Sequence, residues 1–272
     1  LAGIFDGSLT LGDIDNDGEV DVGDLPETVN AERSTFNGER ADYEPIDRRI
    51  IAEAKSLDKW DSMEKEITDL EVKPFIIVDE IGLNSLIKEL DVVDRYAIDL
   101  ETTGLNTLNC EIVGWAIAYG AKSFYIPVLH QGVRQLDAKL VQDRLRVILE
   151  DSSKLQIIQN AKFEQKIFKR LGINIHHNFF DTMLASYVDN PSNKHGLKIQ
   201  SKRIFALRMT EYELLTGTGR KQITIDQVPL DKVAAYAAAD AYITLKLYDH
   251  YSTKLDAREL KLLRELEFPL AE

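Results

Sequence analysis

The chain has 272 residues and is 44% hydrophobic, enough for one large domain or a domain with an extension, and its single cysteine excludes an internal disulfide. A formal net charge of −13 argues against a broad basic surface that would grip duplex DNA by neutralising its phosphates, but not against a site that binds nucleic acid through metal ions. No apolar run approaches the roughly 18 residues of a membrane span and no signal peptide is evident, so we expect a cytoplasmic protein without a membrane partner.

Residues 1–70 are predicted to form an N-terminal extension. Within it, residues 11–25 place acidic side chains at the spacing of a calcium-binding loop, with Gly18 at the sharp turn. This stretch resembles an EF-hand loop, and more closely the loop of dockerin modules, which also ends in Asp. A full dockerin has a second loop that this sequence lacks, and an acidic, turn-rich linker explains the stretch equally well, so both interpretations stay open. The candidate calcium ligands are Asp13, Asp15, Asp17, Glu19, Asp21 and Asp24.

The rest of the extension is expected to connect this loop to the main domain. Residues 30–47 are polar and read as a linker, and residues 48–70 have the apolar spacing of one or two amphipathic helices. Because the chain begins with Leu1 rather than Met, we expect a fragment or a processed product.

Residues 71–258 are predicted to form the main domain, in which strands and helices alternate. The first three strands after residue 90 would make an antiparallel meander, and the alternation that follows favours an α/β sheet with helices against it. The expected elements in chain order are a strand at 74–79, a helix at 83–90, a strand from 95 that breaks at 102–104, strands at 112–118 and 123–128, a helix at 136–149, a strand at 155–159 and helices from 161 onward.

The strand that begins at Arg95 ends in two acidic residues. Asp99 and Glu101 are two apart, and on a strand such side chains project from the same face. Like charges at the end of a buried strand are unfavourable unless cations neutralise them, and Mg²⁺ or Mn²⁺ takes oxygen ligands and leaves sites for water and phosphate. A lone Asp-x-Glu is more often a solvated strand end, so the pair indicates a metal site only together with other acids.

Two further acidic residues could complete such a site. Glu164 follows a strand-to-helix junction, where functional side chains are common in α/β folds, although an acid in a first helical turn also stabilises the helix dipole. Asp240 lies on an alanine-rich helix and shares a helical face with Tyr236 four residues earlier. The alternative for Asp240 is a buried acid satisfied by a neighbouring donor.

In this order, the residues resemble a known family. Asp99-x-Glu101-Thr-Thr-Gly-Leu, then Asn160-x-Lys-Phe, then Tyr236-x-x-x-Asp240 resemble the three exonuclease motifs of the DEDDy 3′→5′ exonucleases. This family has a ribonuclease H-like fold and includes the proofreading domain of bacterial-type family A DNA polymerases (DNA polymerase I). The resemblance implies an α/β, ribonuclease H-like mixed sheet with flanking helices over residues 71–258. It also implies that residues 259–272 are the truncated start of a polymerase domain.

The family's activity gives the expected function. The resemblance implies a metal-dependent 3′→5′ exodeoxyribonuclease that removes 5′-mononucleotides from single-stranded or frayed DNA 3′ ends and proofreads for a covalently linked DNA polymerase. It implies two Mg²⁺ or Mn²⁺ ions as cofactors and Tyr236 as the residue that orients the attacking water. The implied metal ligands are Asp99, Glu101, Glu164 and Asp240, and the implied substrate-binding residues are Leu105, Gln159, Asn160 and Tyr212.

One residue departs from the family pattern. The second motif of the family ends in Asp, whereas this chain has Glu164, which is one methylene longer. Because catalysis is sensitive to small displacements, the alternative function is a catalytically weakened module that binds 3′ ends or acts as a polymerase scaffold. A third reading is a calcium-dependent interaction module at residues 11–25 with the nuclease as its cargo.

Overall fold

The computed structural model describes residues 67–175 and 178–271. The predicted calcium loop and linker, and most of the predicted helical segment at 48–70, lie outside the described residues. The described end of that segment is a strand rather than a helix. Thr68–Asp69 (β1) pairs in parallel with Leu207–Arg208 (β8), so a tertiary partner overrides the helical spacing there.

The main sheet is mixed and has the strand order β2-β5-β4-β3-β6-β7. The predicted meander is confirmed, because β3 pairs antiparallel with β4, and β4 antiparallel with β5. β3 pairs in parallel with β6, and β6 with β7. The strands are β2 (Phe75–Ile76), β3 (Arg95–Thr102), β4 (Ile112–Tyr119), β5 (Lys122–Pro127), β6 (Leu155–Ile158) and β7 (Phe179–Asp181).

Helices flank this sheet. Those before β7 are α2 (Glu80–Asp91), α3 (Ala138–Leu149) and α4 (Ala161–Arg170). Those after it are α5 (Thr182–Asp189), α6 (Leu197–Gln200), η3 (Ser201–Phe205), α7 (Tyr212–Thr216), η4 (Gly219–Lys221), η5 (Ile225–Gln227), α8 (Leu230–Lys254), α9 (Ala257–Leu262), η6 (Leu263–Glu267) and α10 (Phe268–Ala271). None of the described helices is long and apolar enough to cross a membrane.

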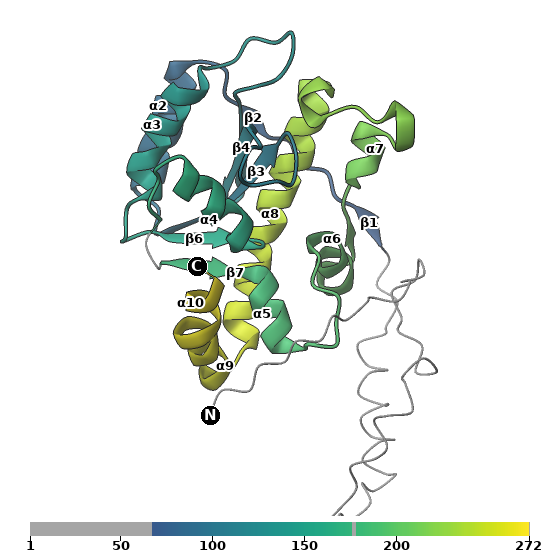
Figure 1. Ribbon diagram of the computed structural model, residues 1–272. Helices are drawn as coiled ribbons and strands as arrows, with labels where there is room; N and C mark the ends of the chain where they lie inside the picture. Colours follow the sequence, from purple (N-terminus) through teal and green to yellow (C-terminus); the bar gives the residue numbers. More distant parts are fainter. Residues whose placement is uncertain (1–66, 176–177, 272) are drawn as a thin grey trace, which may run out of the picture. The chain divides into compact units, whose positions relative to one another are not determined.

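The alternation of side chains along β3 divides the core in two. Tyr96, Ile98 and Leu100 point into a cluster with residues of α2, α3 and α4. Ala97 points into a second cluster, whose helical residues come chiefly from α8. Figure 1 shows α2 and α3 on one side of the strands and α8 on the other. Asp99 and Glu101 follow Ala97 at two-residue intervals, so the same alternation turns both acids toward α8.

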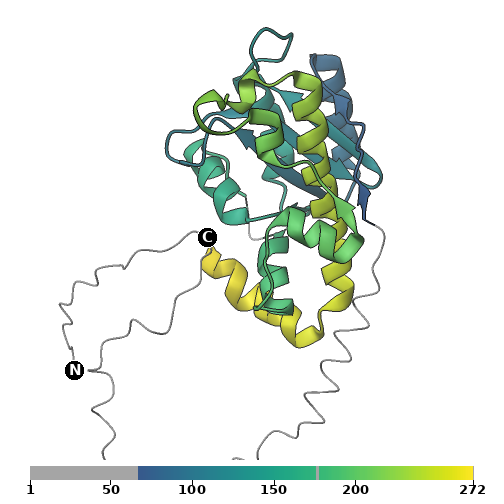
Figure 2. The same ribbon diagram turned by 90° about the vertical axis from the view of Figure 1, so that its right-hand side faces the viewer.

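Small residues let α8 lie close to the sheet. Figure 2 shows α8 as a long helix that crosses the strands. An alanine side chain adds little thickness, so the helix backbone approaches the strands closely, and an acid in the middle of α8 can reach the acids of β3. The alanines that meet in this cluster are Ala97, Ala116 and Ala118 from the sheet and Ala234, Ala237 and Ala241 from α8.

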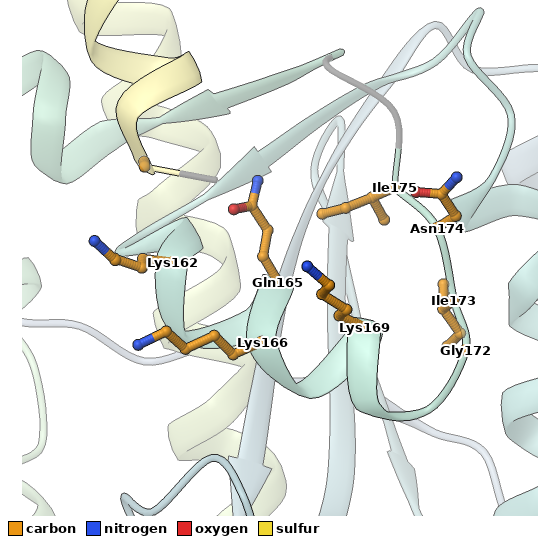
Figure 3. A pocket seen from close by; sticks show the side chains of 9 residues that line it. Lys162, Gln165, Lys166, Lys169, Gly172, Ile173, Asn174 and Ile175 are labelled. Atoms are coloured by element: carbon orange, nitrogen blue, oxygen red, sulfur yellow. The ribbon is translucent and has the colours of Figure 1, made fainter.

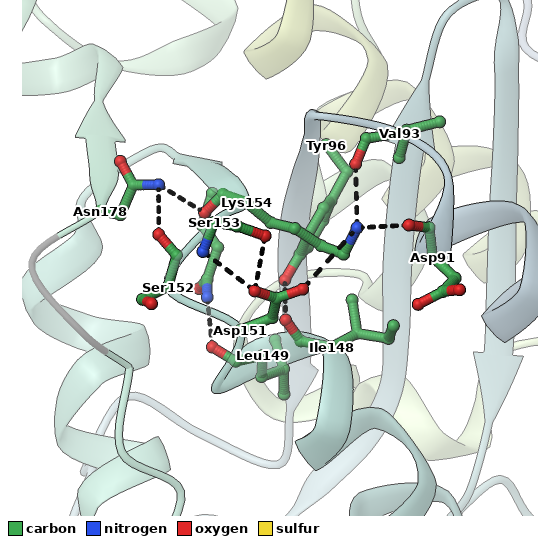
Figure 4. A network of polar contacts seen from close by, with 11 residues as sticks. Asp91, Val93, Tyr96, Ile148, Leu149, Asp151, Ser152, Ser153, Lys154 and Asn178 are labelled. Atoms are coloured by element: carbon green, nitrogen blue, oxygen red, sulfur yellow. Dashed lines mark hydrogen bonds and ion pairs between the residues drawn. The ribbon is translucent and has the colours of Figure 1, made fainter.

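A buried lysine fixes the beginnings of β3 and β6. The Lys154 ammonium donates hydrogen bonds to the carbonyls of Asp91 (2.8 Å) and Val93 (3.1 Å), and lies 3.8 Å from Asp151 Oδ2. Figure 4 shows this network between the end of α2 and the loop before β6. Because β3 and β6 are parallel, their other ends share an edge of the sheet. The network therefore helps to set which residues meet at that edge.

The C-terminal helices pack on the far strand of the sheet. Phe268 of α10 is buried and its ring centroid lies 5.2 Å from that of Phe179 and 5.6 Å from that of Phe180, both in β7. Residues 259–271 therefore contribute to the core of the described fold. The predicted boundaries at 70 and 258 stay predictions.

Gly114 makes room for an aromatic ring beneath the acidic end of β3. It pairs with Glu101 across the β3–β4 ladder, and the register shifts immediately after that pair. A Cβ at residue 114 would overlap the hydroxyl and ring of Tyr125. The Tyr125 hydroxyl lies 2.8 Å from His130 Nε2, so the ring is held where Gly114 leaves space.

We predict that Gly114→Ala destabilises the fold by about 1–3 kcal/mol, because the added methyl group forces Tyr125 out of its place. Urea denaturation followed by circular dichroism measures the change in the free energy of unfolding. Gly104→Ala is the matched control, since a Cβ there meets open space. Equal stabilities of the two variants would contradict this account of Gly114.

Candidate active site

The structure brings three of the predicted acids together. Asp99 and Glu101 come from β3 and Asp240 from the middle of α8, and one carboxylate oxygen of each lies within 4.8 Å of the others. Glu101 and Asp240 are buried and Asp99 is half-buried. Asp240 follows the β3 pair by more than a hundred positions, so only the packing of α8 on β3 brings it to them.

Burial and mutual repulsion make the ionised trio unfavourable. Burial raises the pKa of Asp99 to about 6. The pKa of Glu101 is raised well above its usual value by burial and then by Asp99 and Asp240. The pKa of Asp240 is raised in the same way, by burial first and then by Asp99. The site therefore favours a group that supplies positive charge.

Glu164 lies beside the trio but outside it. It is buried in the first turn of α4, and its Oε2 atom lacks a hydrogen-bond partner among the residues that the structure describes. Its pKa is raised by burial and then by the charge of Asp99. The predicted approach of Glu164 to the acidic pair stays a prediction. Its carboxylate does not join the group whose oxygens lie within 4.8 Å of one another.

A buried aspartate holds the helix that presents Glu164. Asp181 caps α5 by accepting hydrogen bonds from the backbone amides of Met183 (2.8 Å) and Leu184 (3.3 Å). It also accepts hydrogen bonds from the amides of Asn160 (3.2 Å) and Ala161 (2.8 Å) at the start of α4. One carboxylate therefore joins the starts of two helices.

Tyr236 lies one turn before Asp240 on α8, as predicted. Burial and then the negative charge of Asp240 raise the pKa of its hydroxyl, and the tyrosine in turn lowers the pKa of Asp240, against the larger rise that burial causes. The Lys198 ammonium donates a hydrogen bond of 2.9 Å to the Tyr236 oxygen. Tyr212 of α7 packs edge-on against the Tyr236 ring, with centroids 6.5 Å apart.

The other predicted substrate-binding residues differ in their availability. Leu105 is 88% exposed, just after the end of β3. Asn160 is exposed and adopts a left-handed conformation with φ of 67°. The amide group of Gln159, in contrast, donates to the carbonyl of His195 (3.0 Å) and accepts from Thr182 (2.5 Å). Gln159 is therefore engaged inside the fold rather than free to contact a ligand.

Two cavities flank these elements. One of about 360 Å³ opens beside Tyr236 and Asp240 and is also lined by Lys73 and Lys232. The other, of about 350 Å³, lies along α4. Figure 3 shows the side chains of Lys162, Gln165, Lys166 and Lys169 at this second cavity. Lys162 is exposed whereas Glu164, two residues later, is buried, so this lysine face is distinct from the acidic site.

The sequence of this domain matches a known family. Residues 74–256, which contain every predicted site residue outside the calcium loop, match the 3′-5′ exonuclease family of family A DNA polymerases. The chain belongs to this family.

Curated relatives that match this chain are DNA polymerases, which is consistent with this family. DNA polymerase I of Pseudomonas aeruginosa is 30% identical over 230 residues, which make up 81% of this chain and 25% of the relative. The chain thus spans about a quarter of the length of the curated relatives it matches. Membership supports exonuclease activity, the hydrolysis of a phosphodiester bond.

Solved structures establish the fold. Escherichia coli RNase D, described as an exoribonuclease involved in structured RNA processing, superposes with a TM-score of 0.57 at 17% identity over 74% of this chain and 50% of that one. Brucella melitensis NrnC with bound Mg²⁺ gives a TM-score of 0.50 at 20% identity over 66% of this chain and 82% of that one. The predicted ribonuclease H-like mixed sheet with flanking helices is confirmed.

The residues present in this exonuclease domain fit a divalent metal ion. Asp240 Oδ1 and Glu164 Oε2 are buried and have no hydrogen-bond partner within the part of the chain that the structure describes. Hard cations such as Mg²⁺ and Mn²⁺ bind carboxylate oxygens. Positive charge would also offset the repulsion that raises the pKa values of the trio. The acidic trio therefore suits a divalent ion.

Sequence reasoning missed three contributors to this site. Lys198 gave no signal, because it lies in a short helix between loops and follows no motif. The Tyr125–His130 pair also gave none, because the hydrogen bond depends on a strand end and a loop that meet in the fold. The role of Asp181 at the start of α4 was missed as well. Its bonds to the start of α4 join segments twenty residues apart.

We predict that the metal-free chain gains stability as the pH falls. Raised carboxyl pKa values mean that the folded state binds more protons than the unfolded state, so stability is greatest below the ordinary carboxyl pKa and is lost as the pH rises through the Asp99 pKa of about 6. Mg²⁺ or Mn²⁺ should accordingly raise the melting temperature more at about pH 8 than at about pH 6, because protons compete with the ion.

Differential scanning fluorimetry with chelator or metal measures both effects. Asp240→Asn is the matched variant, since it keeps the shape of the side chain and removes one charge. It should be more stable than wild type without metal at about pH 8, by roughly 0.5–2 kcal/mol, and should respond less to metal. A metal response that is independent of pH would contradict the assignment.

Proposed function

We propose that the chain is a metal-dependent 3′→5′ exodeoxyribonuclease that removes 5′-mononucleotides from a single-stranded or frayed DNA 3′ end. The observation that supports this most is the convergence of Asp99, Glu101 and Asp240 within the segment that matches the exonuclease family. The family match gives the reaction class, and the buried acidic trio gives the chain the ligands that this chemistry needs.

The proposed metal ligands are the trio, with Glu164 helping to hold a second ion. When bound, two such ions would activate the attacking water and stabilise the departing 3′ oxygen. Tyr236 would orient the water, since it lies one helical turn before Asp240 on the same face of α8. This role needs a fixed hydroxyl rather than a base, and burial keeps the tyrosine protonated by raising its pKa.

The proposed substrate contacts lie around the acidic site. Leu105, largely exposed at the end of β3, would wedge against the terminal base. Tyr212 would stack on a base, which is a contact that tolerates any sequence. Asn160 would donate to the sugar or backbone. Gln159 would act on the substrate through the loop at His195, because its own amide already donates there.

Local positive charge compensates for the acidity of the chain as a whole. The exposed face of α4 presents Lys162, Lys166 and Lys169 around one cavity. Such a cluster attracts a phosphate backbone even where the net charge is negative, because salt screens charges beyond about 10 Å. We propose that this face binds part of the nucleic acid strand at a position outside the acidic trio.

The curated relatives suggest the setting of this activity. They are DNA polymerases of which the matching part is about a quarter. We propose that the domain proofreads in the cytoplasm for a covalently linked DNA polymerase domain that begins at about residue 259.

We also propose that residues 11–25 bind one calcium ion. Support comes from the spacing of the acids and from the position of Gly18. Calcium titration of the full chain, with amide exchange followed in this stretch, tests the proposal. Exchange that is unchanged by calcium favours the acidic linker instead.

We predict that the purified chain shortens a 5′-labelled single-stranded DNA oligonucleotide one nucleotide at a time in the presence of Mg²⁺ or Mn²⁺. Denaturing electrophoresis resolves the ladder, and an RNA strand of the same sequence measures the preference for sugar. The double variant Asp99→Ala, Glu101→Ala should fall to the background rate. Binding without shortening by the wild type would exclude the nuclease and support the weakened module.

The second candidate function rests on Glu164. Its carboxylate lies outside the trio, as expected if the longer side chain misplaces a metal contact. We predict that Glu164→Asp raises kcat by about tenfold, because displacements of a fraction of an ångström are costly at such sites. The exposed Glu80→Asp is the matched control. A rate equal to or below that of wild type would show that Glu164 is already well placed.

A further inference from the structure

We propose that Lys198 is a positioning residue of the exonuclease site, which orients the Tyr236 hydroxyl toward the acidic trio and supplies a fixed positive charge beside it. The inference rests on the proposed nuclease function and extends it. Lys198 belongs to none of the sequence motifs of the site, and it reaches the site from α6, an element that contributes none of the predicted catalytic residues.

Two contacts join Lys198 to Tyr236. The ammonium donates a hydrogen bond of 2.9 Å to the tyrosine oxygen, and it lies 4.4 Å from the centroid of the same ring. An ammonium group is attracted to the face of an aromatic ring as well as to a hydroxyl oxygen. The two contacts therefore hold the same pair of side chains in one arrangement.

The direction of this hydrogen bond fixes the tyrosine proton. An ammonium group can only donate, so the Tyr236 oxygen must accept and its own proton must point elsewhere. Asp240 lies one helical turn away on the same face of α8. Lys198 thus directs the O–H group toward the acids, where a water molecule bound at the site would meet it.

The lysine itself is held by its surroundings. Its side chain is 19% exposed, and its ammonium lies 3.8 Å from Glu211 Oε2. The end of α6 is anchored by Gln200, which is buried and accepts a hydrogen bond of 2.8 Å from the Tyr251 hydroxyl. Gln200 also donates to the carbonyl of His195 at 2.6 Å. The backbone that presents Lys198 is therefore tied to α8.

The charge of Lys198 acts on the whole trio. Its ammonium lies 2.9 Å from the Tyr236 oxygen, one helical turn before Asp240 on α8, so its positive charge is fixed close to the acids. The same positive charge repels a divalent ion at that position. Removing the Lys198 charge should therefore strengthen metal binding. The same change should weaken the alignment of Tyr236 and so lower kcat.

We predict that Lys198→Met lowers kcat on single-stranded DNA by about tenfold or more with little change in KM, and tightens Mn²⁺ binding by about tenfold. Methionine keeps the length of the stem over the Tyr236 ring. Lys198→Arg should restore most of both values, since it keeps a charged donor. Steady-state rates give kcat and KM, and isothermal titration calorimetry gives the Mn²⁺ affinity.

A double-mutant cycle with Tyr236→Phe separates this role from others. If Lys198 acts through the hydroxyl, Lys198→Met should lower kcat no further in the Tyr236→Phe background. Full additivity, or a rise in KM alone, would mean that Lys198 contacts the phosphate directly and would overturn the inference. Lys202→Met is the matched control, because it removes an exposed lysine four residues away and should leave both readouts unchanged.

The two readouts also separate this inference from the proposed function. A wild-type chain that does not shorten DNA would refute the nuclease, whereas the Mn²⁺ affinities would still test the position of the Lys198 charge. Equal affinities of wild type and Lys198→Met, with equal melting temperatures, would overturn the inference even in an active enzyme.

Discussion

The repulsion among three buried carboxylates is the constraint on which the rest of this structure depends. β3 can offer Asp99 and Glu101 only on the face that also packs against α8, and α8 brings Asp240 to the same point. Packing in the two cores of the sheet must therefore offset the repulsion among the three carboxylates. The fold therefore places this unfavourable group of charges beside the alanine-lined contact between α8 and the sheet.

Two buried charged side chains outside the acidic trio, Lys154 and Asp181, help to hold the strands and helices of the site in place. Lys154 fixes the starts of β3 and β6, so the parallel ends of both strands meet in a defined register. Asp181 ties the start of α4 to the start of α5 and so orients Glu164. Each anchor is a buried charged group with its hydrogen bonds made, and such groups specify one arrangement at a cost that an apolar core would avoid.

The distribution of charge reconciles an acidic chain with a polyanionic substrate. The net charge of −13 includes the acidic trio, which would become a centre of positive charge if divalent ions were bound there. Positive side chains include Lys198 beside the acidic trio and the lysines of α4 on the surface. Such an enzyme would bind its substrate through local positive charge and bound ions rather than through a broad basic surface.

The sequence by itself determined the meander, the strand-to-helix junction before α4, the shared face of Tyr236 and Asp240, and the family. These features are readable because they depend on periodicity and on motif spacing within short segments. Only the tertiary structure decided that Glu164 lies outside the trio, that Gln159 donates a hydrogen bond to the His195 carbonyl, and that Lys198 contacts Tyr236. The physical reason is that these contacts join segments whose distance is set by helix and sheet packing. No local pattern encodes that distance.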